Sequence, residues 1–214
     1  MAVKSNLTNM VLVLGVTCLV CSALLGGAYA LTKDPIDKAA LEKTNRAISQ
    51  VLPAFSETAY KSVPVGDKTY NYYEATNGSS VVGYAIESTT VGFGGNLTLM
   101  VGVTPDGVVC NTSVLSQSET PGLGAKCNTD AKFMAQWKGF DPSSKILSVK
   151  KDGGDVDAIT ASTITSRAYT EAVKNALEAF AAIQGVADDP VISDDPVILG
   201  DSEESNEEGG LSNE

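Results

Sequence analysis

Residues 97–115 of this chain read LTLMVGVTPDGVVCNTSVL. Every second residue over 97–103 is Leu or Val, and a partner strand is expected over 108–115. Period-two alternation predicts strands that bury one face. The intervening residues 104–107, Thr-Pro-Asp-Gly, favour a tight turn, because Pro presets one backbone angle and Gly tolerates positive φ. The stretch therefore predicts two consecutive antiparallel strands.

The same alternation occurs upstream of this stretch. Tyr70–Glu74 and Val81–Glu87 flank the dipeptide Asn77-Gly78. Asn-Gly between alternating apolar segments is a strong hairpin signal, because both residues accept positive φ. The four segments together predict an antiparallel meander with one buried face.

Helices are predicted before and after the predicted sheet. Residues 35–52 predict a helix that Pro53 ends. Residues 167–184 predict the last helix, and Gly185 stands at the position of a C-terminal cap. The apolar stripe of that last helix consists of Tyr169, Val173, Ala176, Leu177, Phe180 and Ile183. We therefore predict an α+β fold, with a largely antiparallel sheet and flanking helices.

The N-terminal end predicts a membrane segment. No charged residue occurs between Lys4 and Lys33, and the apolar run over 10–31 has 22 residues. At about 1.5 Å per residue this run crosses a hydrocarbon core of about 30 Å. The alternative is a cleaved signal peptide, for which Ala28-Tyr29-Ala30 supplies a small-x-small site. Because the run exceeds the roughly 7–15 residues of a signal core, we interpret it as one uncleaved transmembrane helix.

The formal net charge of −11 is concentrated at the C-terminal end. Ten of the 26 acidic residues lie in 186–214, which contains no Lys or Arg, so the rest of the chain has 16 acidic and 15 basic residues. A near-neutral body gives no electrostatic case for nucleic acid as a partner. The chain is thus divided into a short cytoplasmic end (1–9), a transmembrane helix (10–31), a domain exported to the extracytoplasmic side (32–185) and a disordered acidic tail (186–214).

The composition excludes several kinds of chemistry. The chain has no histidine, so imidazole catalysis and His-ligated metals are excluded. Its four cysteines do not form a metal framework, because Cys18 and Cys21 lie in the apolar run, far from Cys110 and Cys127. Redox chemistry would therefore come from an organic cofactor or from thiols. Cys110 and Cys127 could pair in an oxidising compartment or remain unpaired.

A hydroxyl-rich segment precedes the last predicted helix. Residues 157–166 read DAITASTITS, and five of the seven residues from Thr160 to Ser166 carry a hydroxyl group. Such a segment can be a helix N-cap with surplus Ser and Thr. It can also bind phosphate, because a helix N-terminus presents unpaired N–H groups and a positive dipole end. A hydroxyl at that place could also be esterified by a phosphate.

A second candidate segment follows the predicted strand 108–115. Residues 118–124 read SETPGLG. The segment can be an ordinary Pro-Gly surface turn. It can also be a loop whose glycines let the backbone approach a flat ligand closely, with Glu119 and Thr120 available for hydrogen bonds.

The two segments together, in this order after a meander, resemble the FMN-binding domain family. Within that family the chain is similar to the G subunits of Rnf-type ion-translocating electron-transport complexes. The quoted motifs are Glu-Thr-Pro-Gly-Leu-Gly at 119–124 and Asp-x-x-Thr-x-x-Thr at 157–163. The resemblance implies a membrane-anchored redox subunit with covalent FMN, in an inner-membrane ferredoxin:NAD oxidoreductase complex that couples electron transfer to ion translocation. Its alternatives are the C-type flavin subunit of sodium-translocating NADH:quinone oxidoreductase, another flavinylated carrier, or an anchored binding domain without flavin.

The family also implies a specific attachment point. Its second motif is typically Ser/Thr-Gly-Ala-Thr, whose last threonine holds FMN through a phosphoester, and the matching residue is Thr163. This chain departs from the motif with Ala161 in place of Gly and Ser162 in place of Ala. Ala161 would be strained if its backbone needs positive φ. The implied partners are the other membrane subunits, a flavin transferase and the lipid bilayer. The implied FMN-binding residues are Thr163, Thr160, Ser162, Thr165, Ser166, Asp157, Glu119, Thr120, Gly122, Leu123 and Gly124.

Overall fold

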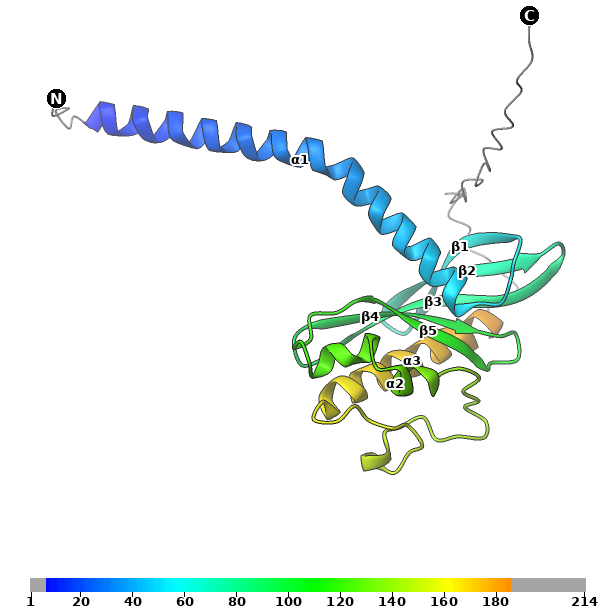
Figure 1. Cartoon of the computed structure of the whole chain (residues 1–214). Coiled ribbons are helices and arrows are strands. Elements are labelled where there is room, and N and C mark those ends of the chain that lie inside the picture. Colours follow the sequence, from blue (N-terminus) through cyan, green and yellow to red (C-terminus); the bar gives the residue numbers. More distant parts are fainter. Residues whose placement is uncertain (1–6, 186–214) are drawn as a thin grey trace, which may run out of the picture. The chain divides into compact units, whose positions relative to one another are not determined.

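The computed structural model describes residues 7–185, so the predicted acidic tail and the first six residues of the predicted cytoplasmic end lie outside the described residues. The chain forms two compact units, one ending at Arg46 and one starting at Ala47. The first unit consists of most of helix α1, Leu7–Val51, drawn from blue to cyan in Figure 1. This helix is long and apolar enough to cross a bilayer, and its most apolar window is not buried within the structure.

Helix α1 corrects one prediction and confirms another. The sequence predicts separate helices over 10–31 and 35–52, whereas the structure has one continuous helix that contains Pro35. A proline removes one backbone hydrogen bond, and the helix continues where the turns on both sides are strong enough. The helix ends at Val51, shortly before Pro53, as predicted.

A five-stranded antiparallel sheet forms the centre of the second unit. Its spatial order is β1-β2-β3-β4-β5, so every strand pairs with its neighbours in sequence, and the predicted meander is confirmed. The sequence did not predict β1, which contains Pro64 and lies at the edge of the sheet, where proline is tolerated. The strands are β1 (Glu57–Val65), β2 (Lys68–Asn77), β3 (Ser80–Val91), β4 (Asn96–Val103) and β5 (Val109–Ser116).

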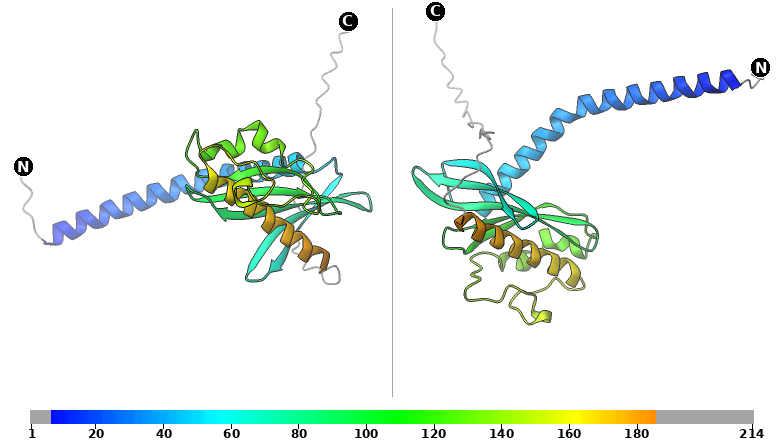
Figure 2. Two further views of the ribbon diagram at one scale, coloured as in Figure 1. Left: turned by 90° about the horizontal axis from the view of Figure 1, so that it is seen from below. Right: turned by 180° about the vertical axis from the view of Figure 1, so that it is seen from behind.

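Both faces of the sheet are buried, which corrects the prediction of a single buried face. Helix α3 (Thr163–Gly185) packs on one face, as the two views of Figure 2 show. The last turn of α1, from Ala47 onward, packs on the other face against residues such as Met100. At Gly102 a Cβ atom would overlap the backbone carbonyl of Val51, so the helix end approaches the sheet at backbone distance.

The segment between β5 and α3 contains only short helices. These are η1 (Gly124–Asn128), α2 (Ala131–Ala135) and η2 (Lys150–Asp152). Helix α3 includes Gly185, which the sequence predicts as the cap after residue 184, and begins at Thr163 rather than at the predicted residue 167. The hydroxyl-rich segment therefore forms the first turn of the helix as well as the loop before it.

Candidate functional site

The two segments singled out in the sequence meet at one cavity of about 340 Å³. One wall comes from the loop after β5, and the other comes from the first turn of α3 and the residues before it. A third segment, the loop between β3 and β4, contributes one aromatic side chain. The lining residues are Phe93, Glu119, Thr120, Leu123, Gly124, Ala161, Ser162, Thr163, Ile164 and Thr165.

Glu119 ties the three segments of the cavity together. Its carboxylate is buried, and Oε2 accepts a hydrogen bond from Oγ1 of Thr165 at 2.7 Å. Its Oε1 accepts a hydrogen bond from the backbone N–H of Gly94 at 3.2 Å. A buried carboxylate needs such partners, because an unpaired buried charge is costly. The cavity walls are therefore fixed relative to one another by a single side chain.

Gly124 makes this arrangement possible. A Cβ atom at this position would overlap Oε2 of Glu119 and would lie 2.6 Å from Oγ1 of Thr165. The close approach explains why a residue without a side chain stands at the end of the Glu-Thr-Pro-Gly-Leu-Gly motif.

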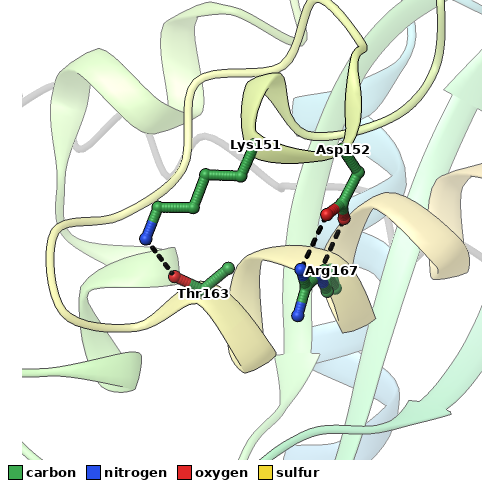
Figure 3. Close-up of polar contacts among 4 residues, drawn as sticks. All are labelled: Lys151, Asp152, Thr163 and Arg167. Carbon is green, nitrogen blue, oxygen red and sulfur yellow. Dashed lines mark hydrogen bonds and ion pairs between the residues drawn. The ribbon is translucent and has the colours of Figure 1, made fainter.

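Thr163 is the first residue of α3 and is half-buried at the cavity wall. Its Oγ1 accepts a hydrogen bond from Nζ of Lys151 at 3.1 Å, as Figure 3 shows. The next residue, Asp152, forms two hydrogen bonds of 2.7 Å with the guanidinium of Arg167, one turn further along α3. The helix η2 is thus held beside the first turn of α3.

The residues before Thr163 have unusual conformations and contacts. Ala161 has a φ of +60°, and it is the only non-glycine residue with positive φ among residues 7–185. Ser162 is buried, and its Oγ has no hydrogen-bond partner within the described part of the chain. The carbonyl of Ser162 accepts a hydrogen bond from the Oγ of Ser166 at 2.9 Å. The loop therefore carries both a strained backbone and an unsatisfied buried hydroxyl at the cavity.

Seven of the eleven predicted FMN-binding residues line the cavity, and four do not. Asp157 pairs instead with Lys150, at 2.8 Å, and this contact lowers the pKa of the Asp157 carboxyl group. Ser166 braces the loop by accepting a hydrogen bond from the backbone N–H of Ile159. Thr160 is exposed, and Gly122 has a φ of +78° in the turn before η1.

Four residues at or beside the cavity are not among the predicted FMN-binding residues. Phe93, Ala161 and Ile164 line it. Lys151 contacts Thr163. The side chains of Phe93, Leu123 and Ile164 are 69%, 44% and 53% exposed, which is unusual for large apolar residues. An aromatic residue between two glycines at 92–94 was the available signal for Phe93, whereas nothing near Lys151 in the sequence points to Thr163.

The cavity has the chemistry that a flavin nucleotide requires. The hydroxyl groups of Ser162 and Thr163, with the N-terminus of α3, suit a phosphate. The exposed apolar side chains at its rim suit a flat aromatic ring. The unpartnered Oγ of Ser162 is a buried donor at the cavity wall, so the residues present fit an FMN phosphate.

Cys110 and Cys127 are free thiols in the structure, so they do not form the possible disulfide. Cys127 is fully buried beneath the loop that carries Glu119, and burial raises the pKa of its thiol to about 11. A thiol in this environment is protonated at neutral pH and behaves as a small apolar core residue.

Comparisons with known proteins match both parts of the chain. Residues 92–178 match the family model of the FMN-binding domain, and residues 1–51 match that of the RnfG N-terminal region. The chain is 33% identical over 180 residues to the G subunit of the proton-translocating ferredoxin:NAD(+) oxidoreductase complex of Clostridium ljungdahlii, covering 83% of this chain and 89% of that protein. It is 30% identical over 191 residues to the G subunit of the ion-translocating oxidoreductase complex of Methanosarcina acetivorans, covering 86% of this chain and 100% of that protein. The crystal structure of Shewanella oneidensis NqrC has a TM-score of 0.46 and 19% identity, covering 64% of this chain and 72% of that chain.

Proposed function

Because this chain belongs to the family of G subunits of ion-translocating oxidoreductase complexes, we propose that it carries electrons through FMN bound covalently to Thr163. The complex would be a ferredoxin:NAD oxidoreductase in which electron transfer is coupled to ion movement. The Clostridium ljungdahlii relative is named as a subunit of a proton-translocating ferredoxin:NAD(+) oxidoreductase complex. The subunit is one redox station and not a complete enzyme. Its partners are the other membrane subunits, with a flavin transferase for maturation.

The chain is a single-pass membrane protein with its span in α1. We place the span at residues 10–31 of the inner membrane and the domain 32–185 on its extracytoplasmic side, with 186–214 as an acidic extension. A tether of this kind raises the effective concentration of the flavin near its redox partners. A cofactor held outside the cytoplasm cannot be replaced from the cytoplasmic pool, which favours a covalent bond.

The single observation that supports the attachment point is the position of Thr163. Its hydroxyl stands at the cavity wall, in the first turn of a helix, and accepts a hydrogen bond from a lysine ammonium. To form the ester, Oγ1 of Thr163 would bond to the phosphorus atom of the FMN portion of an activated flavin nucleotide. The leaving group of that nucleotide departs with the bonding electron pair, and the hydroxyl proton is released.

Other residues of the cavity hold the nucleotide without reacting. The buried hydroxyl of Ser162 would donate to a phosphate oxygen, which would satisfy a group that has no partner within the described residues. Phe93, Leu123 and Ile164 would hold the ring system, and the Glu119–Thr165 pair keeps the walls in place. When bound, FMN supplies the one- and two-electron chemistry, and the protein supplies position and electrostatics.

The test compares three forms of the full chain, each co-expressed with a flavin transferase. We expect wild type to give a fluorescent band after denaturing electrophoresis, and the peptide spanning Asp155 to Arg167 to gain the mass of one FMN minus water. Thr163→Val should lose both signals. Thr129→Val is the matched control, because Thr129 is an exposed threonine outside the cavity, and it should keep both.

A wild-type chain with no added mass on that peptide would contradict the proposal. Mass on another hydroxyl residue, with Thr163→Val still fluorescent, would contradict the attachment point while leaving a flavin carrier in place.

A further inference from the structure

We infer that Lys151 supplies the counter-charge for the phosphoryl group on Thr163 and so acts as a positioning residue for the flavin. This inference rests on the proposed function. It adds a residue that lies outside both motifs and that reaches the site from a separate segment of the chain. The observation behind it is the 3.1 Å hydrogen bond from Nζ of Lys151 to Oγ1 of Thr163 (Figure 3).

The ion pair between Asp152 and Arg167 places Lys151 beside Thr163. Asp152 accepts hydrogen bonds from Nε and Nη2 of the guanidinium, and two parallel hydrogen bonds of this kind fix orientation as well as distance. Lys150 pairs with Asp157, but these side chains are 60% and 48% exposed, and an exposed pair of this kind contributes little to stability. The contact with Arg167 therefore holds η2 beside the first turn of α3, with Lys151 next to Asp152.

The backbone at the end of η2 is equally constrained. Gly153 has a φ of +85° in the left-handed region, and a Cβ atom at Gly154 would overlap the backbone carbonyl of Ser148. This tight turn fixes the shape of the segment that carries η2. The hydrogen bonds between Asp152 and Arg167 hold that segment beside α3, which brings Lys151 to Thr163.

Among the described residues, Lys151 has no carboxylate at ion-pair distance, although its charge contributes to the lowered pKa of the neighbouring Asp152. Within residues 7–185, Lys150 and Arg167 each form an ion pair, whereas Lys151 forms none. Its ammonium instead contacts the neutral Thr163 hydroxyl. A phosphodiester on Oγ1 would carry one negative charge, and its non-bridging oxygens would lie two bonds from that atom. The lysine ammonium is a compact charge on a flexible four-carbon stem, so it can move from the hydroxyl oxygen to a phosphate oxygen nearby.

The test measures the melting temperature of the detergent-solubilised full chain, with and without covalent flavin, obtained by expression with and without the transferase. Wild type, Lys151→Gln, Lys151→Arg and Lys150→Gln are compared. Lys150→Gln is the matched control, since it removes the same charge from the same short helix. In wild type the flavin should raise the melting temperature, and Lys151→Gln should reduce this rise by about 2–4 °C. Lys151→Arg and Lys150→Gln should keep it.

Salt provides a second measurement, because a partly exposed ion pair is screened. The rise caused by flavin should shrink in about 1 M salt for wild type and should not change for Lys151→Gln. A merely structural role for Lys151 would lower the melting temperatures of both forms equally and leave the rise intact, which would overturn the inference. An equal loss in Lys150→Gln would overturn it too, because the effect would then be one of net charge.

Two further outcomes have a defined meaning. If Lys151→Gln takes up no flavin while Lys151→Arg and Lys150→Gln do, the inference is supported, since only the charge at residue 151 separates these variants. If wild type itself takes up no flavin, the proposed function fails first, and the inference falls with it.

Discussion

Glu119 and Thr165 are joined by a 2.7 Å hydrogen bond between Oε2 and Oγ1, although 46 positions separate them in the chain. Both side chains are buried. The bond links the loop after β5 to the first turn of α3, and these two elements form two walls of the cavity. The pair therefore couples the stability of the domain to the geometry of the site.

Removal of the Thr165 hydroxyl should measure this coupling. In Thr165→Val, Oε2 of Glu119 stays buried without its donor, and we expect a loss of about 1–3 kcal/mol of unfolding free energy. Denaturant unfolding, followed by the fluorescence of Trp137, the single tryptophan, gives this value. Thr129→Val is the control and should change it by less than about 0.5 kcal/mol, as exposed positions do. Equal stability of the two variants would mean that the buried bond contributes nothing.

Substitution of Ala161 by glycine should destabilise the domain less than the same substitution of a helical alanine. Its φ of +60° costs about 1–2 kcal/mol for a residue with a Cβ atom. Ala161→Gly relieves this cost but adds about 0.4–1 kcal/mol of unfolded-state entropy. We expect the variant to be as stable as wild type or up to about 1.6 kcal/mol more stable. Ala181→Gly, at an exposed position inside α3, should lose about 0.5–1 kcal/mol. A larger loss at Ala161 than at Ala181 would contradict the strain.

The carboxyl group of Asp152, which pairs with Arg167, should titrate below the usual pH range of a carboxyl group. The guanidinium of Arg167 lowers the pKa of Asp152 from its ordinary value of 3.8, because it donates hydrogen bonds to the charged form. A lowered pKa contributes stability that is present above pH 3.8 and is lost as the pH falls through the lowered value. The side-chain carboxyl shift of Asp152, followed by carbon NMR, should report this titration.

Arg167→Gln should raise the pKa of Asp152 toward its ordinary value, because the largest cause of the lowering is removed. Lys174→Gln, an exposed change about two turns further along α3, should leave it lowered. An ordinary titration of Asp152 in wild type would show that the two hydrogen bonds do not form in solution.

Cys127 should resist alkylation in the folded protein. With a pKa of about 11, its thiolate fraction at about pH 8 is roughly one in a thousand. In a chain with Cys18→Ser and Cys21→Ser, a thiol reagent at that pH should modify the half-buried Cys110 first, and Cys127 only after unfolding. The intact mass should not change on reduction, because both thiols are free. A mass gain of two hydrogens on reduction would instead identify a disulfide.

Much of the fold follows from local sequence patterns. Alternation over 97–103 and the turn at 104–107 produce β4 and the hairpin to β5, and the apolar stripe after residue 167 produces α3. The two loop motifs also predict seven of the residues that line the cavity. The predictions of the strands and the helix are confirmed because each depends on the conformational preferences of neighbouring residues and on which face they bury.

Other features could not be predicted from local patterns. The second buried face of the sheet depends on the last turn of α1, which covers Met100 and its neighbours. Small residues such as Ala75 and Ala85 on that face carry little period-two signal, so the sequence shows one buried face where the structure has two. The strand β1 was also not predicted, because Pro64 weakens its pattern.

The sequence by itself determined the apolar helix, the meander, the last helix and the threonine that the family motif marks, since these properties belong to residues close together in the chain. Only the tertiary structure decided that Glu119 meets Thr165, and that Lys151 reaches Thr163. Contacts of this kind depend on how elements pack, and packing is determined by the shape and hydrogen bonding of the whole domain. No periodicity in the chain indicates which distant side chains will share a wall.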